Sequence, residues 1–351
     1  MTLHTDLSSE GPATGPRRVS AASVARAAGV STAAVSYALN GRPGVSSETR
    51  QRILTLAQVL GHPGPRQTGA HSRVIGLVVA DLANPFYTQI AAGVVDAARA
   101  AGYEVFIAHA PDADGSVEPL VQAMVDRGVD AVLLTVLRSD SGEAIRALRK
   151  SRTPWVQISR RMAAVPADFV GIDDASAASA MMHHVLDHGY SSIATIVGPR
   201  ASSASASRED AFLEVAHRRG VNLVEHLSVP VTEEGGRAAV HRLLSRGPLP
   251  RALVCGSDAI ALGVLSELAN RGIAVPEAVA VTGFDGLPEA LSPLIPLTTV
   301  IQPRRRMGER AVELVLERVQ GSGGAIESVI LDYELRICGS CGCAPDNGGV
   351  T

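Results

Sequence analysis

Short apolar runs that alternate with amphipathic stretches are the feature that most constrains how this chain can fold. The runs lie at residues 74–80, 105–108, 131–136, 155–159, 170–172, 193–197, 252–255 and 279–282. Strands buried on both faces of a sheet have this composition, and the helical stretches between them imply parallel β-α-β units. About 270 residues of this pattern exceed one sheet. We therefore expect an α/β core of two doubly wound parallel sheets in two lobes, with a ligand cleft between them.

Residues 19–61, here called the headpiece, show a different pattern, that of a small all-α unit. Helices are expected over 21–28, ending at Gly29, and over 32–39, with Ser31 as N-cap. A third helix follows, capped by Ser46 or Ser47, and its apolar residues at helical spacing are Ile53, Leu56, Ala57 and Leu60.

Three further segments have the composition of tails or linkers. Residues 1–18 are rich in Gly, Pro, Ser and Thr and are expected to form a disordered tail, as are residues 344–351. Residues 62–73 contain two prolines and two internal glycines. We expect them to link the headpiece to the core at residues 74–343.

Charge is distributed unevenly along the chain, whose formal net charge is −3. Residues 1–70 contain seven Arg against Asp6, Glu10 and Glu48, so the N-terminal part is basic and the remainder is acidic. A basic unit on an acidic body indicates a polyanionic partner for that unit. A solvated basic surface without a partner is the alternative that charge alone leaves open.

The spacing of the first two predicted helices is typical of a helix-turn-helix, whose second helix enters the major groove of DNA. Small or hydrogen-bonding residues occupy the outward positions of a helix that begins at residue 32, namely Thr32, Ala33, Ser36, Tyr37 and Asn40. A three-helix interaction module that binds no DNA is the alternative reading of this pattern.

Motifs in a fixed order resemble those of the lactose-repressor (LacI/GalR) family of transcriptional regulators. In the headpiece they are VSAASVARAAGVS at 19–31, VSYALNG at 35–41 and VSSETR at 45–50. In the core they are IGLVVADLANPFY at 75–87, Gly198-Pro199 with Arg208 and Phe212, Ser257-Asp258 with Ala261 and Gly263, Gly283-Phe284-Asp285, and residues 297–303. The resemblance spans residues 19–343.

The resemblance implies a homodimer, in some members a tetramer, whose two headpieces read a pseudo-palindromic operator in double-stranded DNA. The positions that match the family's DNA contacts are Ser31, Thr32, Ala33, Ser36, Tyr37 and Asn40, with Thr49 near the DNA backbone. Ala33 and Tyr37 occupy variable base-reading positions and are expected to select the operator. Members usually carry a hinge helix after the third helix, with a leucine that wedges into the minor groove. Residues 62–73 contain no leucine, so this hinge is degenerate.

The core resembles periplasmic sugar-binding proteins, which implies a small polar effector in the cleft, a sugar or sugar derivative being favoured. The positions that match ligand contacts are Asp81, Asn84, Phe86, Ser159, Arg160, Arg208, Ser257 and Asp285. Arg208 would clamp the effector through bidentate hydrogen bonds. From the residues alone, a surface arginine paired with Asp210 is the alternative.

Two substitutions depart from the family's ligand site. Ser159 stands where members commonly have Asp, and Asp173-Asp174 replaces a frequent Asp-Asn pair. The single tryptophan, Trp155, is expected in a strand core, which leaves Phe86, Tyr87 or Phe284 to stack on a sugar.

Two groups of metal-ligating residue types each fall short of a metal site. His184 and His188 lie at i and i+4 of a predicted helix, but Asp187 stands where a zinc-protease motif needs Glu, and no third ligand is evident. Three thiols lie within six residues, at Cys338, Cys341 and Cys343, without a fourth ligand at a suitable spacing. We therefore predict no metal and no cofactor.

Enzymatic and membrane functions find no support in the motifs. The sequence contains no Gly-x-Ser-x-Gly elbow, and its only lysine, Lys150, follows Arg149 rather than the glycine of a phosphate loop. No apolar run approaches the roughly 20 residues of a membrane helix. The first 18 residues show no secretory signal, so a cytoplasmic protein is expected. The sequence favours an effector-controlled repressor, and a stand-alone solute-binding protein with a vestigial headpiece is the alternative.

Overall fold

Parallel β-α-β units form most of the protein in the computed structural model, as the apolar runs predict. The structure describes residues 20–39, 43–60, 72–110, 117–138, 141–162, 164–221, 223–321 and 324–343. The predicted tails, and nearly all of the predicted linker, lie outside these residues. The chain divides into two compact units, Met1–His71 and Ser72–Thr351. Within the described ranges, every helix is too short or too polar to span a bilayer.

Three helices form the first unit around an apolar core of their own. They are α1 (Ala21–Ala28), α2 (Thr32–Leu39) and α3 (Ser47–Val59). Val24, Val35 and Ile53, one from each helix, are fully buried. Gly29 ends α1 in the left-handed conformation, with a φ of 64° that glycine adopts without strain. The predicted bounds of the first two helices are confirmed, whereas Leu60 lies beyond the end of α3 and is exposed.

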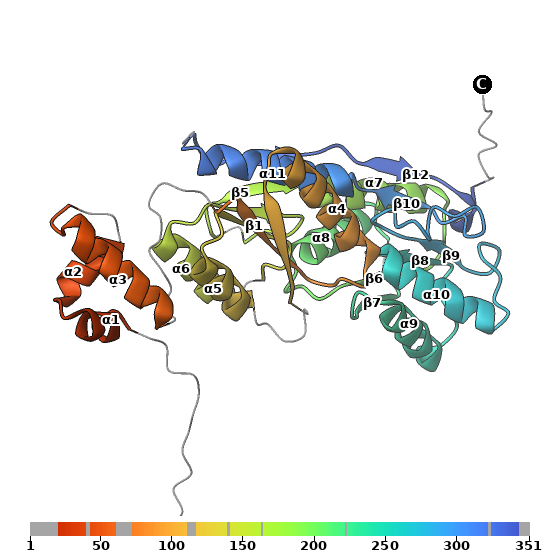
Figure 1. The fold of residues 1–351 in the computed structure, drawn as a ribbon. Coiled ribbons are helices and arrows are strands. Elements are labelled where there is room, and N and C mark those ends of the chain that lie inside the picture. The colour runs from red at the N-terminus through yellow and green to blue at the C-terminus, as the bar shows by residue number, and fades with distance from the viewer. Residues whose placement is uncertain are drawn as a thin grey trace, which may run out of the picture. The chain divides into compact units, whose positions relative to one another are not determined.

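The first lobe of the second unit is built on a six-stranded parallel sheet in the order β11-β5-β4-β3-β1-β2. Its strands are β1 (Val74–Val79), β2 (Glu104–His109), β3 (Ala131–Leu134), β4 (Trp155–Ile158), β5 (Asp168–Gly171) and β11 (Ser328–Ile330). One face of the sheet is covered by α4 (Pro85–Ala100) and α11 (Arg304–Val319), and the other by α5 (Val117–Arg127) and α6 (Gly142–Ser151) (Figure 1).

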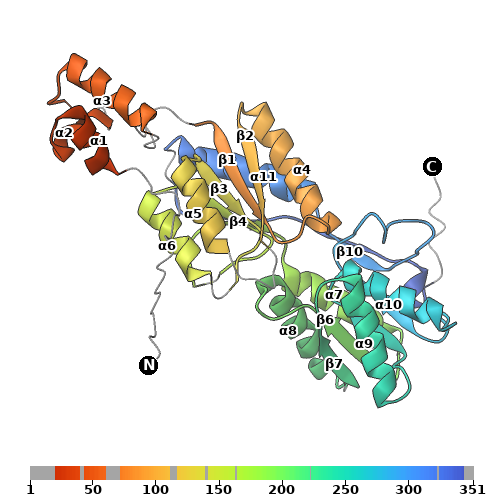
Figure 2. The same ribbon diagram turned by 60° about the horizontal axis from the view of Figure 1, so that its bottom comes forward.

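The second lobe is built on a four-stranded parallel sheet in the order β7-β6-β8-β9. Its strands are β6 (Ile193–Val197), β7 (Glu225–Ser228), β8 (Ala252–Cys255) and β9 (Ala280–Thr282). Its helices pack in two pairs, α7 (Asp174–Asp187) with α8 (Ser203–Arg218), and α9 (Glu233–Arg246) with α10 (Asp258–Asn270) (Figure 2). An antiparallel pair, β10 (Thr299–Ile301) and β12 (Glu334–Arg336), leads to a short 3-10 turn, η1 (Gly339–Cys341).

The chain passes between the two lobes three times. The passages follow β5, β10 and β11. Because α11 and β11 come after the whole of the second sheet and yet belong to the first lobe, each lobe is assembled from separate stretches of the sequence. Both apolar sheets share one continuous core with the helices that cover them.

Close backbone contacts join the paired helices in both lobes. A methyl group on Gly93 of α4 would collide with the carbonyl oxygen of Arg305, and one on Gly308 of α11 with that of Ile90. In the second lobe, Gly263 of α10 lies in the same way against the backbone of α9. Glycine is required at these positions because the two backbones leave no room for a side chain.

Three details differ from the sequence-based expectation. The edge strand β2 is not buried on both faces: 47% of Phe106 and 45% of Ile107 are exposed. Strand β7 was not expected, because Glu-His-Leu-Ser is too polar to stand out as an apolar run. Trp155 begins β4 but is only half-buried, since it lies at the rim of the sheet.

Candidate functional site

One exposed face of α2 carries the residues expected to read DNA. Val35, Ala38 and Leu39 pack into the headpiece core, so the opposite face of the helix is turned to solvent. Exposed on or just before that face are Ser31, Thr32, Ala33, Ser36 and Tyr37. The Oγ atom of Ser31 accepts a hydrogen bond from the Ala34 backbone N at 3.1 Å, which fixes the start of the helix.

Tyr37 is the largest side chain on this face, and 41% of it is exposed. Its ring lies over Gly44, where a Cβ atom would come within 3.3 Å of Cδ2. Thr49, in the first turn of α3, is half-buried and bonds to Ser46 through both its backbone N and its hydroxyl. Asn40, also predicted to contact DNA, lies outside the described residues.

A cavity of about 430 Å³ opens between the two lobes at the carboxyl ends of their strands. This is the edge at which ligands bind in doubly wound sheets. The first lobe contributes Ala80, Asp81, Asn84, Tyr87, His109, Arg138 and Arg160 to its walls, and the second lobe contributes Pro199, Ala201, Ser202, Pro230, Val231 and Thr232. The cavity is therefore walled by both lobes.

Three of the predicted ligand residues line this cavity. Asn84 caps α4, since its Oδ1 accepts from the Phe86 backbone N at 2.9 Å. Asp81 accepts in the same way from the Ala83 backbone N at 2.8 Å. Buried Arg160 donates from Nη2 to the Tyr87 hydroxyl at 2.6 Å. Each of these polar side chains is therefore positioned by a hydrogen bond within the protein.

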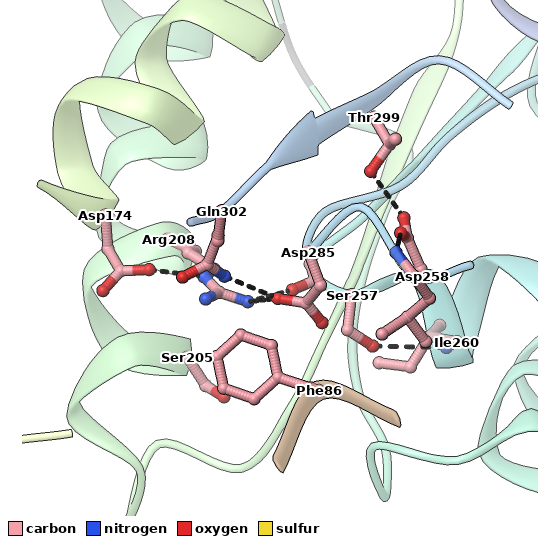
Figure 3. Close-up of polar contacts among 12 residues, drawn as sticks. Phe86, Asp174, Ser205, Arg208, Ser257, Asp258, Ile260, Asp285, Thr299 and Gln302 are labelled. Atoms are coloured by element: carbon pink, nitrogen blue, oxygen red, sulfur yellow. Dashed lines mark hydrogen bonds and ion pairs between the residues drawn. The ribbon is translucent and has the colours of Figure 1, made fainter. Parts of the chain in front are cut away.

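Arg208 is the centre of a second polar group, which we call the Arg208 cluster: Arg208, Asp174, Asp285 and Gln302 (Figure 3). Only 6% of Arg208 is exposed. Its Nε donates to Asp174 Oδ1 at 2.8 Å and its Nη1 to Asp285 Oδ1 at 3.1 Å. Nη1 also donates to the carbonyl oxygen of Gly256 at 2.8 Å, and Gln302 Nε2 donates to Asp285 Oδ1 at 2.7 Å.

The surface alternative for Arg208 is therefore wrong. Asp210 pairs instead with Arg200, at 2.7 Å and in an exposed position. The Arg208 guanidinium lies over the ring of Phe284, with its central carbon 3.8 Å from the ring centroid. Phe284 is fully buried beneath it, so this aromatic ring is not open to a sugar.

Burial dominates the electrostatics of the cluster. It raises the pKa of Asp285 to about 7, although the charge of Arg208 acts in the opposite direction. The pKa of Asp174 is raised for the same reason. Burial disfavours the charged form of Arg208, but Asp174 and Asp285 outweigh it and raise its pKa, so the guanidinium stays charged. Nearby, burial raises the pKa of Asp258 to about 6.

The other predicted ligand residues lie outside the cavity wall. Phe86 comes from the first lobe, and its buried ring extends between Ser205 and Ser257 of the second (Figure 3). Ser257 caps α10 by accepting from the Ile260 backbone N at 3.2 Å. Ser159 is buried with a φ of 64°, and its backbone N donates to the Val170 carbonyl oxygen at 2.9 Å.

Several cavity residues were not predicted from the sequence. His109 is the last residue of β2 and Arg138 lies shortly after β3, and a position at the carboxyl end of a strand is the signal that could have found them. Ser202 follows β6 in the same way. Thr232 follows β7, and it was missed together with that strand.

Comparison with known proteins identifies the family. A family model described as bacterial regulatory proteins, lacI family, matches residues 22–62, and one described as a periplasmic binding protein-like domain matches residues 182–341. Over 341 residues the chain is 32% identical to the HTH-type transcriptional regulator MalR of Streptomyces coelicolor, which covers 93% of this chain and 98% of that protein. The chain belongs to the LacI family. It is a helix-turn-helix transcriptional regulator, as the resemblance predicted.

Other known proteins match the chain over nearly the same length. The HTH-type transcriptional repressor CytR of Escherichia coli is 30% identical over 329 residues, covering 92% of this chain and 96% of its own. A solved complex of the transcriptional regulator CelR with cellobiose is 28% identical, with a TM-score of 0.71 over 92% of this chain and 100% of that one. A lac repressor dimer bound to operator, 22% identical with a TM-score of 0.71 over 93% and 99%, shares the fold.

Proposed function

We propose that this LacI-family regulator is a cytoplasmic repressor, and not an enzyme, whose operator binding is controlled by a small polar effector between its lobes. The cavity of about 430 Å³ carries the proposal, because its walls come from both lobes. A ligand there stabilises one relative arrangement of the lobes over others, which is how binding shifts a conformational equilibrium. The cellobiose in the CelR complex favours a sugar or sugar derivative as the effector class.

The cavity wall supplies the chemistry that a hydroxyl-rich ligand needs. Its charged groups include the guanidinium groups of Arg138 and Arg160 and the carboxylate of Asp81. Guanidinium groups donate to hydroxyl or carboxylate oxygens, and Asp81 accepts from hydroxyl groups. Tyr87 adds an aromatic ring to the wall. We assign direct effector contacts to Asp81, Asn84 and Arg160.

The Arg208 cluster is suited to transmit closure of the cleft. Asp174 follows the first passage between the lobes, and Gln302 begins the second passage, just after β10. Arg208 donates directly to Asp174. It is linked to Gln302 through Asp285, whose carboxylate accepts hydrogen bonds from both residues. On the family resemblance, we assign the Arg208 guanidinium a contact with the effector. We propose that Phe86, Ser159, Ser257 and Asp285 shape the same end of the cleft.

On the DNA side, we propose that α2 reads the operator. Ser31, Thr32, Ala33, Ser36, Tyr37 and Asn40 would contact the major groove, with Thr49 near a phosphate. Ala33 and Tyr37 would select the base pairs. Ser and Asn side chains also bond phosphates, which sets the register without reading sequence. Residues 62–73 would serve as a linker without the usual leucine wedge, so we expect the operator to be bent less.

A homodimer follows from the need to read two half-sites about one helical turn apart. The exposed edge of β2 offers a self-complementary surface, since Phe106 and Ile107 are half-exposed on a strand with one neighbour. His109, at the end of the same strand, lines the cavity. An effector that contacts His109 would therefore act on the strand that forms the dimer edge.

Fluorescence anisotropy with labelled DNA from upstream of the protein's own gene tests the proposal. We expect sequence-selective binding whose affinity falls steeply as salt rises, because phosphate contacts release counterions. A panel of mono- and disaccharides is then added at fixed salt, and one class should change the affinity for this DNA. Equal binding to random DNA of the same length, or no response to any sugar, would contradict the corresponding half of the proposal.

A further inference from the structure

Four metal-ligating side chains from two distant parts of the chain converge at the end of α7. His184 and His188 lie one helical turn apart, the first on α7 and the second as its C-cap. Cys341 and Cys343 lie in the C-terminal turn that follows β12. The ligand atoms of the four side chains all lie within 4.8 Å of one another. From the sequence alone the two histidines lacked a third ligand and the three thiols a fourth, and the fold brings the two histidines to two of the thiols.

Three nitrogen–sulfur distances in this group lie close to the edge length of a tetrahedral zinc site. A zinc ion with bonds of 2.0–2.1 Å to nitrogen and 2.3 Å to sulfur places nitrogen and sulfur ligands about 3.6 Å apart. His184 Nε2 lies 3.2 Å from Cys341 Sγ and 3.8 Å from Cys343 Sγ. His188 Nε2 lies 3.4 Å from Cys343 Sγ. Both imidazoles thus direct the same nitrogen, Nε2, toward the thiols.

The surrounding hydrogen bonds hold the turn against the second lobe. Ser340 Oγ donates to the Val281 carbonyl oxygen of β9 at 2.6 Å and accepts from the Thr298 backbone N at 2.9 Å. The Tyr190 hydroxyl donates to the Cys341 carbonyl oxygen at 2.5 Å, and the Tyr190 ring stacks on His188 with centroids 5.4 Å apart. The ligands are therefore preorganised by contacts that do not involve a metal.

We propose that His184, His188, Cys341 and Cys343 bind one Zn²⁺ ion in a closed, structural Cys2His2 site. Four protein ligands complete a tetrahedron and leave no position for a reacting molecule, which distinguishes a structural from a catalytic zinc site. Two thiolates and two imidazoles favour zinc over the harder ions Mg²⁺ and Ca²⁺. On binding, each thiol releases its proton to solvent and each neutral imidazole contributes its Nε2 lone pair.

The ion would fasten the end of the chain to α7. At its N-terminal end α7 begins with Asp174, which belongs to the Arg208 cluster. Cys341 is fully buried, whereas the other three ligands are half-buried, so the ion is shielded but can be reached by a chelator.

The zinc content of the purified full chain, free of any metal-binding tag and kept reduced, tests the proposal. After incubation with Zn²⁺ and removal of the excess, elemental analysis should find about one zinc per chain. His184→Asn and Cys343→Ser should each lower this content at least about tenfold, because each removes one of four ligands. His183→Asn and Cys338→Ser are matched controls, since each changes the same residue type outside the ligand set and should retain the metal.

A second measurement uses the unaltered chain, so that it does not depend on the folding of the variants. Co²⁺ in place of zinc should give the d–d bands of a tetrahedral ion and a thiolate-to-metal charge-transfer band, and a zinc chelator should lower the melting temperature of the zinc-loaded protein. Zinc at background level in the wild-type chain, a cobalt spectrum without the thiolate band, or equal loss of zinc in the control variants would overturn the proposal.

Discussion

Replacement of Arg208 by methionine should destabilise the protein by an amount that depends on pH. Methionine keeps part of the apolar stem but removes the guanidinium that lies over Phe284, and with it both ion pairs, to Asp174 and to Asp285. Removing one partner of a buried pair costs about 3–5 kcal/mol, because the remaining charge is buried without compensation. We therefore expect Arg208→Met to lower the free energy of unfolding by that amount at pH 8.

The pH dependence follows from the buried carboxyl group of Asp285. Its pKa in the folded protein is about 7, against an ordinary value of 3.8, so the folded state binds a proton that the unfolded chain does not. Stability from this group is present at low pH and is lost as the pH rises through 7. Without Arg208 the pKa of Asp285 rises further, so the folded variant keeps this proton from pH 6 to pH 8. The unfolded chain does not bind it, and the free energy of unfolding therefore falls by about 2.7 kcal/mol over this range. In the wild type Asp285 loses its proton within this pH range, so the free energy of unfolding falls by only about half as much, roughly 1.4 kcal/mol.

Urea unfolding of the wild type and of Arg208→Met, followed by circular dichroism at pH 6 and pH 8, measures both effects. The destabilisation should be at least about 1.4 kcal/mol larger at pH 8 than at pH 6, and a second substitution, Asp285→Asn, should reduce this difference to the contribution of Asp174. Arg218→Met is the control: its pair with Glu214 is exposed on both sides and is worth about 1 kcal/mol or less. Equal destabilisation by Arg208→Met at the two pH values would refute the role assigned to Asp285.

Three further predictions concern other surfaces. Tyr37→Ala should weaken binding to the operator by about 1–3 kcal/mol and leave binding to random DNA unchanged, as measured by anisotropy; equal losses on both DNAs would refute base reading by Tyr37. Gly93→Ala should lower the free energy of unfolding by about 1–3 kcal/mol, because the methyl group meets the backbone of α11, whereas Gly142→Ala has open space and should be near neutral. Phe106→Glu should shift sedimentation velocity toward the monomer, and an unchanged dimer would place the interface elsewhere.

The headpiece was predictable from local signals. Gly29 ends the first helix and Ser31 begins the second, and both act through their own backbone or side chain on residues a few positions away. The parallel sheets of the core were predictable for a related reason, since strands buried on both faces need long apolar runs. Strand β7 lies at a sheet edge and carries Glu225 and His226, so it lacks that signal.

The partners of Arg208 could not be predicted from the residues alone. Asp174 and Asp285 lie 34 and 77 positions away, and only the packing of α7 and α8 and the end of β9 bring them to the guanidinium. Asp210 lies two positions from Arg208 on the same helix and was the ion-pair partner that the sequence suggested, but its side chain is exposed and pairs with Arg200. The four-ligand cluster of α7 and the C-terminal turn was missed for the same reason, since its two histidines lie more than 150 positions from its two cysteines.

The first lobe remains incomplete until late in synthesis, because its last strand and helix come near the end of the chain. Strand β5 ends at Gly171, whereas its neighbour β11 ends at Ile330, and α11, which covers α4, lies just before β11. At about 5–20 residues per second, the roughly 160 intervening residues take about 8–32 s to translate. During this interval the nascent first sheet has an unpaired β5 edge and an uncovered apolar face. Slower translation beyond Gly171, or expression in cells depleted of chaperones, should therefore reduce the yield of soluble protein. The reduction should be larger than the free energy of unfolding of the finished protein would indicate.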